Sequence, residues 1–205
     1  MLNRHARDAF TRFFTPLAAF LLRLGISPDA VTLAGTLGVS LGAIVLFPLG
    51  QLFWGVVVIT VFVFSDVIDG IMARLANRAG SWGSFLDSTL DRVQDGAVFA
   101  GIAFWYLGAG HDFATGVLAV VCLALGNIVS YARAKAESLG YSANVGIAER
   151  AERLVSTLVV TGLVGLGLPV QFLTWTLALL ALASAVTVIQ RVLTVRAQAA
   201  SGNAS

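Results

Sequence analysis

The sequence predicts an all-α integral membrane protein with six transmembrane helices, preceded by an amphipathic helix at the membrane surface. Of its 205 residues, 58% are hydrophobic and 12% are charged, about half the charged fraction of a soluble domain. All thirteen Lys and Arg residues fall into four clusters. The intervals 24–73, 93–132 and 154–190 between these clusters contain no basic residue. Each interval is long enough for two spans of about 20 residues.

A short break lies near the middle of each interval, at residues 48–50, 108–112 and 167–169. Because glycine and proline interrupt helices, each interval is predicted to hold two spans. Six spans place both termini on the same side of the membrane. The basic clusters mark that side as cytoplasmic by the positive-inside rule, and the membrane is expected to be the cell membrane.

The N-terminal 26 residues are predicted to form a cytoplasmic amphipathic helix that lies along the membrane. Aromatic and leucine side chains recur there at helical spacing between arginines, which is typical of interfacial helices. Gly25 is predicted to end this helix, and Ser27 and Pro28 to begin the first span.

A single domain of six helices is predicted over residues 27–196. The Ala-, Ser- and Gly-rich residues 197–205 are predicted to be a disordered tail. The expected spans are 30–47, 52–75, 83–107, 113–138, 153–168 and 172–194.

Four aspartates within 26 residues are the main functional signal. Asp66 and Asp69 lie near the end of the second span, and Asp87 and Asp91 near the start of the third. Each pair shares one helix face, and the short connection makes the two helices antiparallel neighbours. Facing carboxylates suit Mg²⁺, with Mn²⁺ as an alternative, and two such ions can clamp a phosphoryl group.

Space for a ligand is predicted beside these carboxylates, because Gly70, Ala73 and Gly83 have little or no side chain. The start of the first span, with Thr32 one turn in, offers backbone N–H groups to a phosphate, although a plain helix start is the alternative. Asp95, one turn beyond Asp91, is predicted to be a structural partner of an arginine or a helix end.

The aspartates have two alternative interpretations. They could cap helices or pair with arginines, or they could line an ion or proton pathway of a transporter. A transport pathway should have polar residues across the whole membrane, whereas these aspartates cluster at one predicted side.

The spacing D-x2-D-G-x2-A-R-x8-G-x3-D-x3-D resembles the signature of the CDP-alcohol phosphotransferase family. The resemblance implies transfer of a phosphatidyl group from a CDP-linked donor to an alcohol, with release of CMP. All eight fixed positions match, at Asp66, Asp69, Gly70, Ala73, Arg74, Gly83, Asp87 and Asp91.

The resemblance also implies roles for individual residues, and a homodimer. Asp66, Asp69 and Asp87 would be metal ligands, and Asp91 both a ligand and the proton acceptor. The family often has Asn where this chain has Asp29. The residues implied for CDP-diacylglycerol are Asp29, Ala30, Val31, Thr32, Gly70, Ala73, Arg74, Gly80 and Gly83.

A second basic set lies at the predicted cytoplasmic ends of spans four to six. Three cationic helix ends could surround a second phosphate, which favours a phosphorylated acceptor alcohol. Anchoring to lipid headgroups is the alternative.

The segments SYARAKAESLG and IAERAERL resemble the actinobacterial branch of the family, whose acceptor is inositol 1-phosphate. By that resemblance Lys135, Arg153 and Arg191 bind the acceptor phosphate, with Ser130 and Arg133 as weaker candidates. Synthesis of phosphatidylglycerolphosphate from glycerol 3-phosphate is the alternative reaction.

Overall fold

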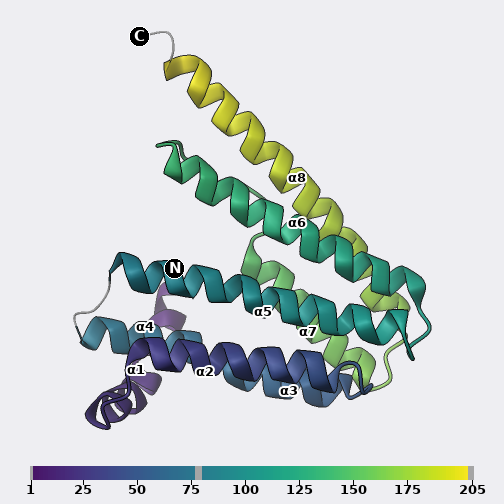
Figure 1. Cartoon of the computed structure of the whole chain (residues 1–205), viewed down its shortest axis with the longest axis horizontal. Coiled ribbons are helices and arrows are strands. Elements are labelled where there is room, and N and C mark those ends of the chain that lie inside the picture. The colour runs from purple at the N-terminus through teal and green to yellow at the C-terminus, as the bar shows by residue number, and fades with distance from the viewer. Residues whose placement is uncertain (1, 77–79, 203–205) are drawn as a thin grey trace. The chain divides into compact units, whose positions relative to one another are not determined.

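The structure is a computed structural model that describes residues 2–76 and 80–202, with side chains described for 13–76 and 80–201. Every regular element in this part of the chain is a helix (Figure 1). The chain divides into two compact units. The first is Met1–Ile44 with Val57–Val98, and the second is Val45–Val56 with Phe99–Ser205.

The first unit contains three complete helices, the larger part of α3 and the first part of α5. Gly25, with φ +79°, ends α1 as predicted, and the Ser27 hydroxyl caps α2 by accepting the Ala30 N–H at 3.2 Å. Its helices are α1 (Leu2–Arg23), α2 (Pro28–Leu41), α3 (Leu52–Val63), α4 (Ser65–Leu75) and α5 (Ser81–Leu107).

Helix α1 packs against α4 through a small apolar core. Ala18 of α1 and Ile71 and Met72 of α4 are its buried residues. Phe14 stacks on Phe64 with ring centroids 5.9 Å apart. Pro16 lies inside α1 without dividing it.

Helix α2 approaches the junction of α3 and α4 closely because two of its residues are glycines. A Cβ atom at Gly35 would lie 1.7 Å from the Ser65 hydroxyl, and one at Gly38 would lie 2.2 Å from the Phe62 ring. Larger residues would therefore push α2 away. This close approach brings the start of α2 alongside the carboxylates of α4.

The second unit is built on α6 (Phe113–Ser138) and α8 (Gln171–Gly202), which lie side by side (Figure 1). Helix α7 (Arg150–Gly165) packs on α8. Asp112 caps α6 by accepting the Thr115 N–H at 2.9 Å. The hydroxyls of Thr115 and Thr174 are 2.6 Å apart and join α6 to α8.

Residues 141–149, here called the connecting segment, link α6 to α7 without regular structure. Side chains of α8 hold this segment in place. The amide of Gln198 bonds both the N–H and the carbonyl of Ser142, at 2.9 and 2.6 Å. The hydroxyl of Thr187 accepts the N–H groups of Ile147 and Ala148, at 3.1 and 3.2 Å.

Four of the six predicted spans are long and apolar enough to cross a membrane. Helix α5 has 27 residues, but it carries four charged side chains, Asp87, Asp91, Arg92 and Asp95. Helix α7 has only 16 residues. Within the described residues the four stretches are Pro28–Leu46, Leu52–Leu75, Phe113–Ser138 and Gln171–Ser201.

The first two spans have nearly the predicted bounds, at Pro28–Leu46 and Leu52–Leu75, but neither is one uninterrupted α-helix. The first span continues beyond α2 as a short π-helix, η1 (Gly42–Leu46), and the second is interrupted at Phe64. The predicted disordered tail is helical as far as Gly202, while residues 203–205 lie outside the described part. Alanine is the strongest helix former, and the two bonds of Gln198 to Ser142 hold this end of α8 in place.

Candidate active site

The four aspartates lie on α4 and α5 of the first unit. Asp69 is buried, with 7% of its surface exposed, while Asp66 and Asp91 are half-buried and Asp87 is exposed. Asp66 and Asp87 are the neighbouring charges that act on Asp69. Asp69 is therefore within electrostatic range of a carboxylate from each helix, as expected for antiparallel neighbours.

The donor chemistry of these residues fits a hard divalent cation, because all four offer carboxylate oxygens. There is also room beside them. A Cβ atom at Gly83 would meet nothing within 4 Å, and one at Gly70 would meet only the Arg74 guanidinium, at 3.7 Å. Among the described residues, however, no three His, Cys, Asp or Glu side chains converge closely enough to hold an ion. The four-aspartate metal site therefore stays a prediction.

Thr32 contacts the aspartates through its side chain. Its hydroxyl donates to Asp69 Oδ2 at 2.5 Å and also lies 3.2 Å from the Pro28 carbonyl. A hydroxyl has one proton, and the carboxylate is the stronger acceptor. Thr32 was predicted to bind the donor substrate, and the structure places its hydroxyl on an expected metal ligand.

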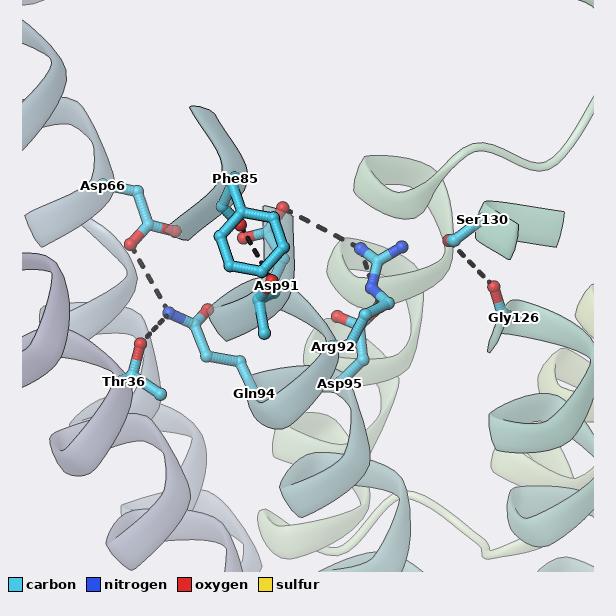
Figure 2. Close-up of polar contacts among 10 residues, drawn as sticks. Thr36, Asp66, Phe85, Asp91, Arg92, Gln94, Asp95, Gly126 and Ser130 are labelled. Atoms are coloured by element: carbon cyan, nitrogen blue, oxygen red, sulfur yellow. Dashed lines mark hydrogen bonds and ion pairs between the residues drawn. The ribbon is translucent and has the colours of Figure 1, made fainter. Parts of the chain in front are cut away.

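Sequence reasoning missed a second polar contact to the aspartates, made by Gln94 of α5. Its side-chain amide donates to the Thr36 hydroxyl at 3.2 Å and to Asp66 Oδ1 at 3.5 Å (Figure 2). A signal was available, because Gln94 lies three residues after Asp91 and so shares its helix face. Three helices of the first unit meet at this buried amide.

Arg92 lies between Asp91 and Asp95 (Figure 2). Its Nη2 atom is 3.8 Å from Asp91 Oδ2 and 3.5 Å from Asp95 Oδ2. The pairing of Asp95 with an arginine is confirmed. The same guanidinium also faces the aspartate that is expected to accept a proton.

The start of α2 is less open to a ligand than predicted. The N–H of Ala30 donates to the Ser27 hydroxyl, and the N–H of Val31 to the Ser27 carbonyl at 3.3 Å. Asp29 accepts the indole N–H of Trp82 at 3.0 Å, so the start of α2 is joined to the start of α5.

The remaining residues predicted for the donor lie at or after the end of α4. Ala73 is half-buried, while Arg74 and Gly80 are exposed. Arg74 follows Gly70 by one turn of α4, so its guanidinium borders the space beside Asp69 and Gly70.

Two of the five residues predicted for the acceptor phosphate are buried arginines of the second unit. Arg191 of α8 donates from Nε to the Val145 carbonyl at 3.0 Å and from Nη1 to the Val129 carbonyl at 2.5 Å. Arg153 of α7 donates to the Ala148 carbonyl at 3.1 Å. Both arginines therefore hold the connecting segment, a role that the sequence did not predict.

The other three candidates lie on the last turns of α6. The hydroxyl of half-buried Ser130 donates to the Gly126 carbonyl at 3.0 Å (Figure 2). Arg133 is exposed and pairs with Glu137 at 3.0 Å, and Lys135 is exposed.

Ser130 and the two buried arginines meet on one stretch of α6. A Cβ atom at Gly126 would lie 3.1 Å from the Arg153 guanidinium, and Arg191 reaches the carbonyl of Val129. The structure therefore brings Arg153, Arg191 and Ser130 together along residues 126–130, with Arg133 one turn further on.

Comparison with known proteins decides the family. The model of the CDP-alcohol phosphatidyltransferase family matches residues 25–189. The chain belongs to this family. It is therefore a phospholipid-synthesising transferase, and its apolar helices are those of a membrane protein.

The curated relatives are similar over nearly their whole length. Phosphatidylinositol phosphate synthase of Streptomyces avermitilis is 53% identical over 211 residues, which cover 100% of this chain and 86% of that protein. The enzyme of the same name from Cutibacterium acnes is 44% identical, over 94% of this chain and 96% of that protein.

Two solved structures of Mycobacterium tuberculosis phosphatidylinositol phosphate synthase share the fold. The one with CDP-DAG bound has a TM-score of 0.86 and 39% identity, covering 90% of this chain and 94% of that chain. The complex with manganese and citrate has a TM-score of 0.85 and 39% identity, covering 89% and 88%.

Proposed function

We propose that this transferase moves the phosphatidyl group from CDP-diacylglycerol to inositol 1-phosphate, giving phosphatidylinositol phosphate and CMP. The observation that carries the proposal is the complete eight-position aspartate motif in a chain 53% identical to a phosphatidylinositol phosphate synthase. The arginines near residues 126–130 of α6 support an acceptor that carries its own phosphate.

We further infer that six helices cross the cell membrane with both termini and the active site facing the cytoplasm. In this topology residues 1–26 form a surface helix, and residues 27–196 form the catalytic domain. A homodimer is the expected assembly, by resemblance to the family.

Asp66, Asp69, Asp87 and Asp91 would hold two Mg²⁺ ions, with Mn²⁺ as an alternative. Bound cations would neutralise the pyrophosphate of the donor and stabilise the charge on departing CMP. The hydrogen bonds from Thr32 to Asp69 and from Gln94 to Asp66 support this role, because they orient carboxylates of the first unit.

The reaction itself needs one proton acceptor and one in-line attack. Asp91 accepts the proton of an inositol hydroxyl, and the hydroxyl oxygen forms a bond to the β-phosphorus of CDP-diacylglycerol. The bond from that phosphorus to the CMP oxygen breaks, and CMP leaves. Holding both substrates in line removes much of the entropic cost of their encounter.

An acceptor panel tests the proposal. Purified protein is given CDP-diacylglycerol and Mg²⁺ with inositol 1-phosphate, inositol or glycerol 3-phosphate, and CMP release is measured. Among the three acceptors, we expect rapid CMP release only with inositol 1-phosphate. Faster release with glycerol 3-phosphate would instead identify phosphatidylglycerolphosphate synthesis, and no metal-dependent release with any acceptor would refute a transferase function.

A further inference from the structure

The side-chain amide of Gln94 on α5 is a deeply buried polar group of the first unit. It is 1% exposed, deeper than any of the four aspartates. Burying an amide away from water is unfavourable unless hydrogen bonds within the protein replace those to water. An apolar residue would avoid that cost, so the amide at this position needs a reason.

The partners of the amide indicate the reason. Gln94 Nε2 donates to the Thr36 hydroxyl on α2, at 3.2 Å, and to Asp66 Oδ1 on α4, at 3.5 Å (Figure 2). An amide nitrogen carries two N–H groups in one plane, so one nitrogen can serve both acceptors. Thr36 is itself buried, with 4% of its surface exposed.

The position of Gln94 along α5 links this contact to the other carboxylates. Asp87, Asp91 and Gln94 are spaced four and three residues apart, so they form one stripe of the helix. The hydrogen bond from Gln94, at the end of this stripe, to Asp66 sets the axial register of α5 relative to α4. The depth of Asp87 and Asp91 relative to Asp66 is set in the same way.

The contact also sets the direction of the Asp66 carboxylate. Gln94 and the Ser65 hydroxyl both lie 3.5 Å from the same oxygen, Oδ1. Groups that hydrogen-bond a metal-binding carboxylate orient it, and their loss commonly weakens metal binding 10- to 100-fold.

We propose that Gln94 is a positioning residue for the metal site: its amide orients Asp66 and sets the register of α5 against α4. The inference rests on the proposed function, since it assumes that Asp66 binds a divalent cation. It adds a residue outside the eight-position motif. The role proposed for Gln94 is to position Asp66, not to contact the substrates.

Mn²⁺ binding to the purified full-length protein tests this inference without substrates. Free Mn²⁺ is measured by electron paramagnetic resonance during a titration, and thermal unfolding is followed in parallel. Gln94→Met keeps the length of the side chain and removes both hydrogen bonds. We expect its Kd for Mn²⁺ to rise about tenfold or more.

The matched control is Thr115→Val in the second unit. Thr115 is 0% exposed, and its hydroxyl also joins two helices, at 2.6 Å from Thr174. This variant should lower the melting temperature comparably and leave the Kd for Mn²⁺ unchanged. Equal Kd values for Gln94→Met and wild type, or an equal rise in Thr115→Val, would overturn the inference.

Two further outcomes are distinguishable. If Gln94→Met does not fold, Gln94→Ser replaces it, because water can enter beside the short hydroxyl and bond Thr36. The same tenfold rise in the Kd for Mn²⁺ is expected for Gln94→Ser, and an unchanged Kd would count against the inference. If wild type itself binds no Mn²⁺, the metal site of the proposed function fails, and this inference fails with it.

Discussion

The hydrogen bond from Thr32 to Asp69 gives the sharpest prediction. Thr32→Val keeps the shape of the side chain and replaces the donating hydroxyl by a methyl group. Both residues are 7% exposed, so water cannot easily take the place of the hydroxyl. A hydrogen bond to a charged group contributes about 1.5–3 kcal/mol.

That free energy predicts two measurable losses. If the bond holds Asp69 in its working orientation, kcat/KM for CDP-diacylglycerol falls about 10- to 100-fold, since each 1.4 kcal/mol is a factor of ten. The melting temperature falls by about 3–12 °C, at 2–4 °C per kcal/mol for a chain of this size. Both are measured on detergent-purified protein, by CMP release and by a thermal-shift assay.

Thr32→Ser is the rescue variant, because it retains the hydroxyl and loses only a methyl group. It should keep kcat/KM within a few-fold of wild type. If Thr32→Val were as active and stable as wild type, the bond would have no role. If Thr32→Ser were as impaired as Thr32→Val, packing rather than hydrogen bonding would explain the loss.

Four further predictions test the other site residues. Asp91→Asn should lower kcat about 10²- to 10⁴-fold and retain some equilibrium binding of CDP-diacylglycerol, because three of the four aspartates remain; near-normal turnover would exclude Asp91 as proton acceptor. Lys135→Ala should raise the acceptor KM several-fold with no change in melting temperature, because Lys135 is exposed, and a loss confined to kcat would contradict this. Arg191→Met should raise the acceptor KM as well, and in addition lower the melting temperature by several degrees, because two backbone carbonyls lose their donor. An unchanged melting temperature would show that these bonds are dispensable. Trp82→Phe removes the hydrogen bond to Asp29 and should raise the KM of CDP-diacylglycerol a few-fold while the acceptor KM stays constant. Equal rises in both KM values would argue against a specific role of this bond in donor binding.

The sequence predicted those parts of the fold that short-range chemistry determines. Gly25 ends α1 and Ser27 begins α2 because a glycine with positive φ and a side-chain cap act within one turn. The bounds of α6 were predicted correctly, since Asp112 caps its start and charged residues mark its end.

Other features depend on contacts between distant residues, which a single sequence does not reveal. The interruption at Phe64 has no glycine or proline to announce it, and lies where α2 packs closely through Gly35. The helical end of α8 is joined to Ser142, 56 positions away from Gln198. Composition alone made this end look disordered.

The candidate site shows the same division. Spacing along two helices predicted the four aspartates and their common face, because helix geometry is local. Spacing could not show that Arg153 and Arg191 are buried against backbone carbonyls. Nor could it show that Gln94 reaches Asp66, since that depends on how α2, α4 and α5 pack.

Side chains of other helices hold the connecting segment by hydrogen bonds to its main chain. The path of its backbone therefore depends little on which side chains the segment itself carries. Gln198, Arg191 and Thr187 all bond backbone N–H or carbonyl groups there. Gly146 is an exception, because its φ is +146° and a Cβ atom would lie 2.4 Å from the Thr187 methyl group; Ala143 and Ala148 are further exceptions, because both are buried. An exposed position such as Asn144 is therefore a suitable place to attach a spectroscopic label without altering the course of the backbone.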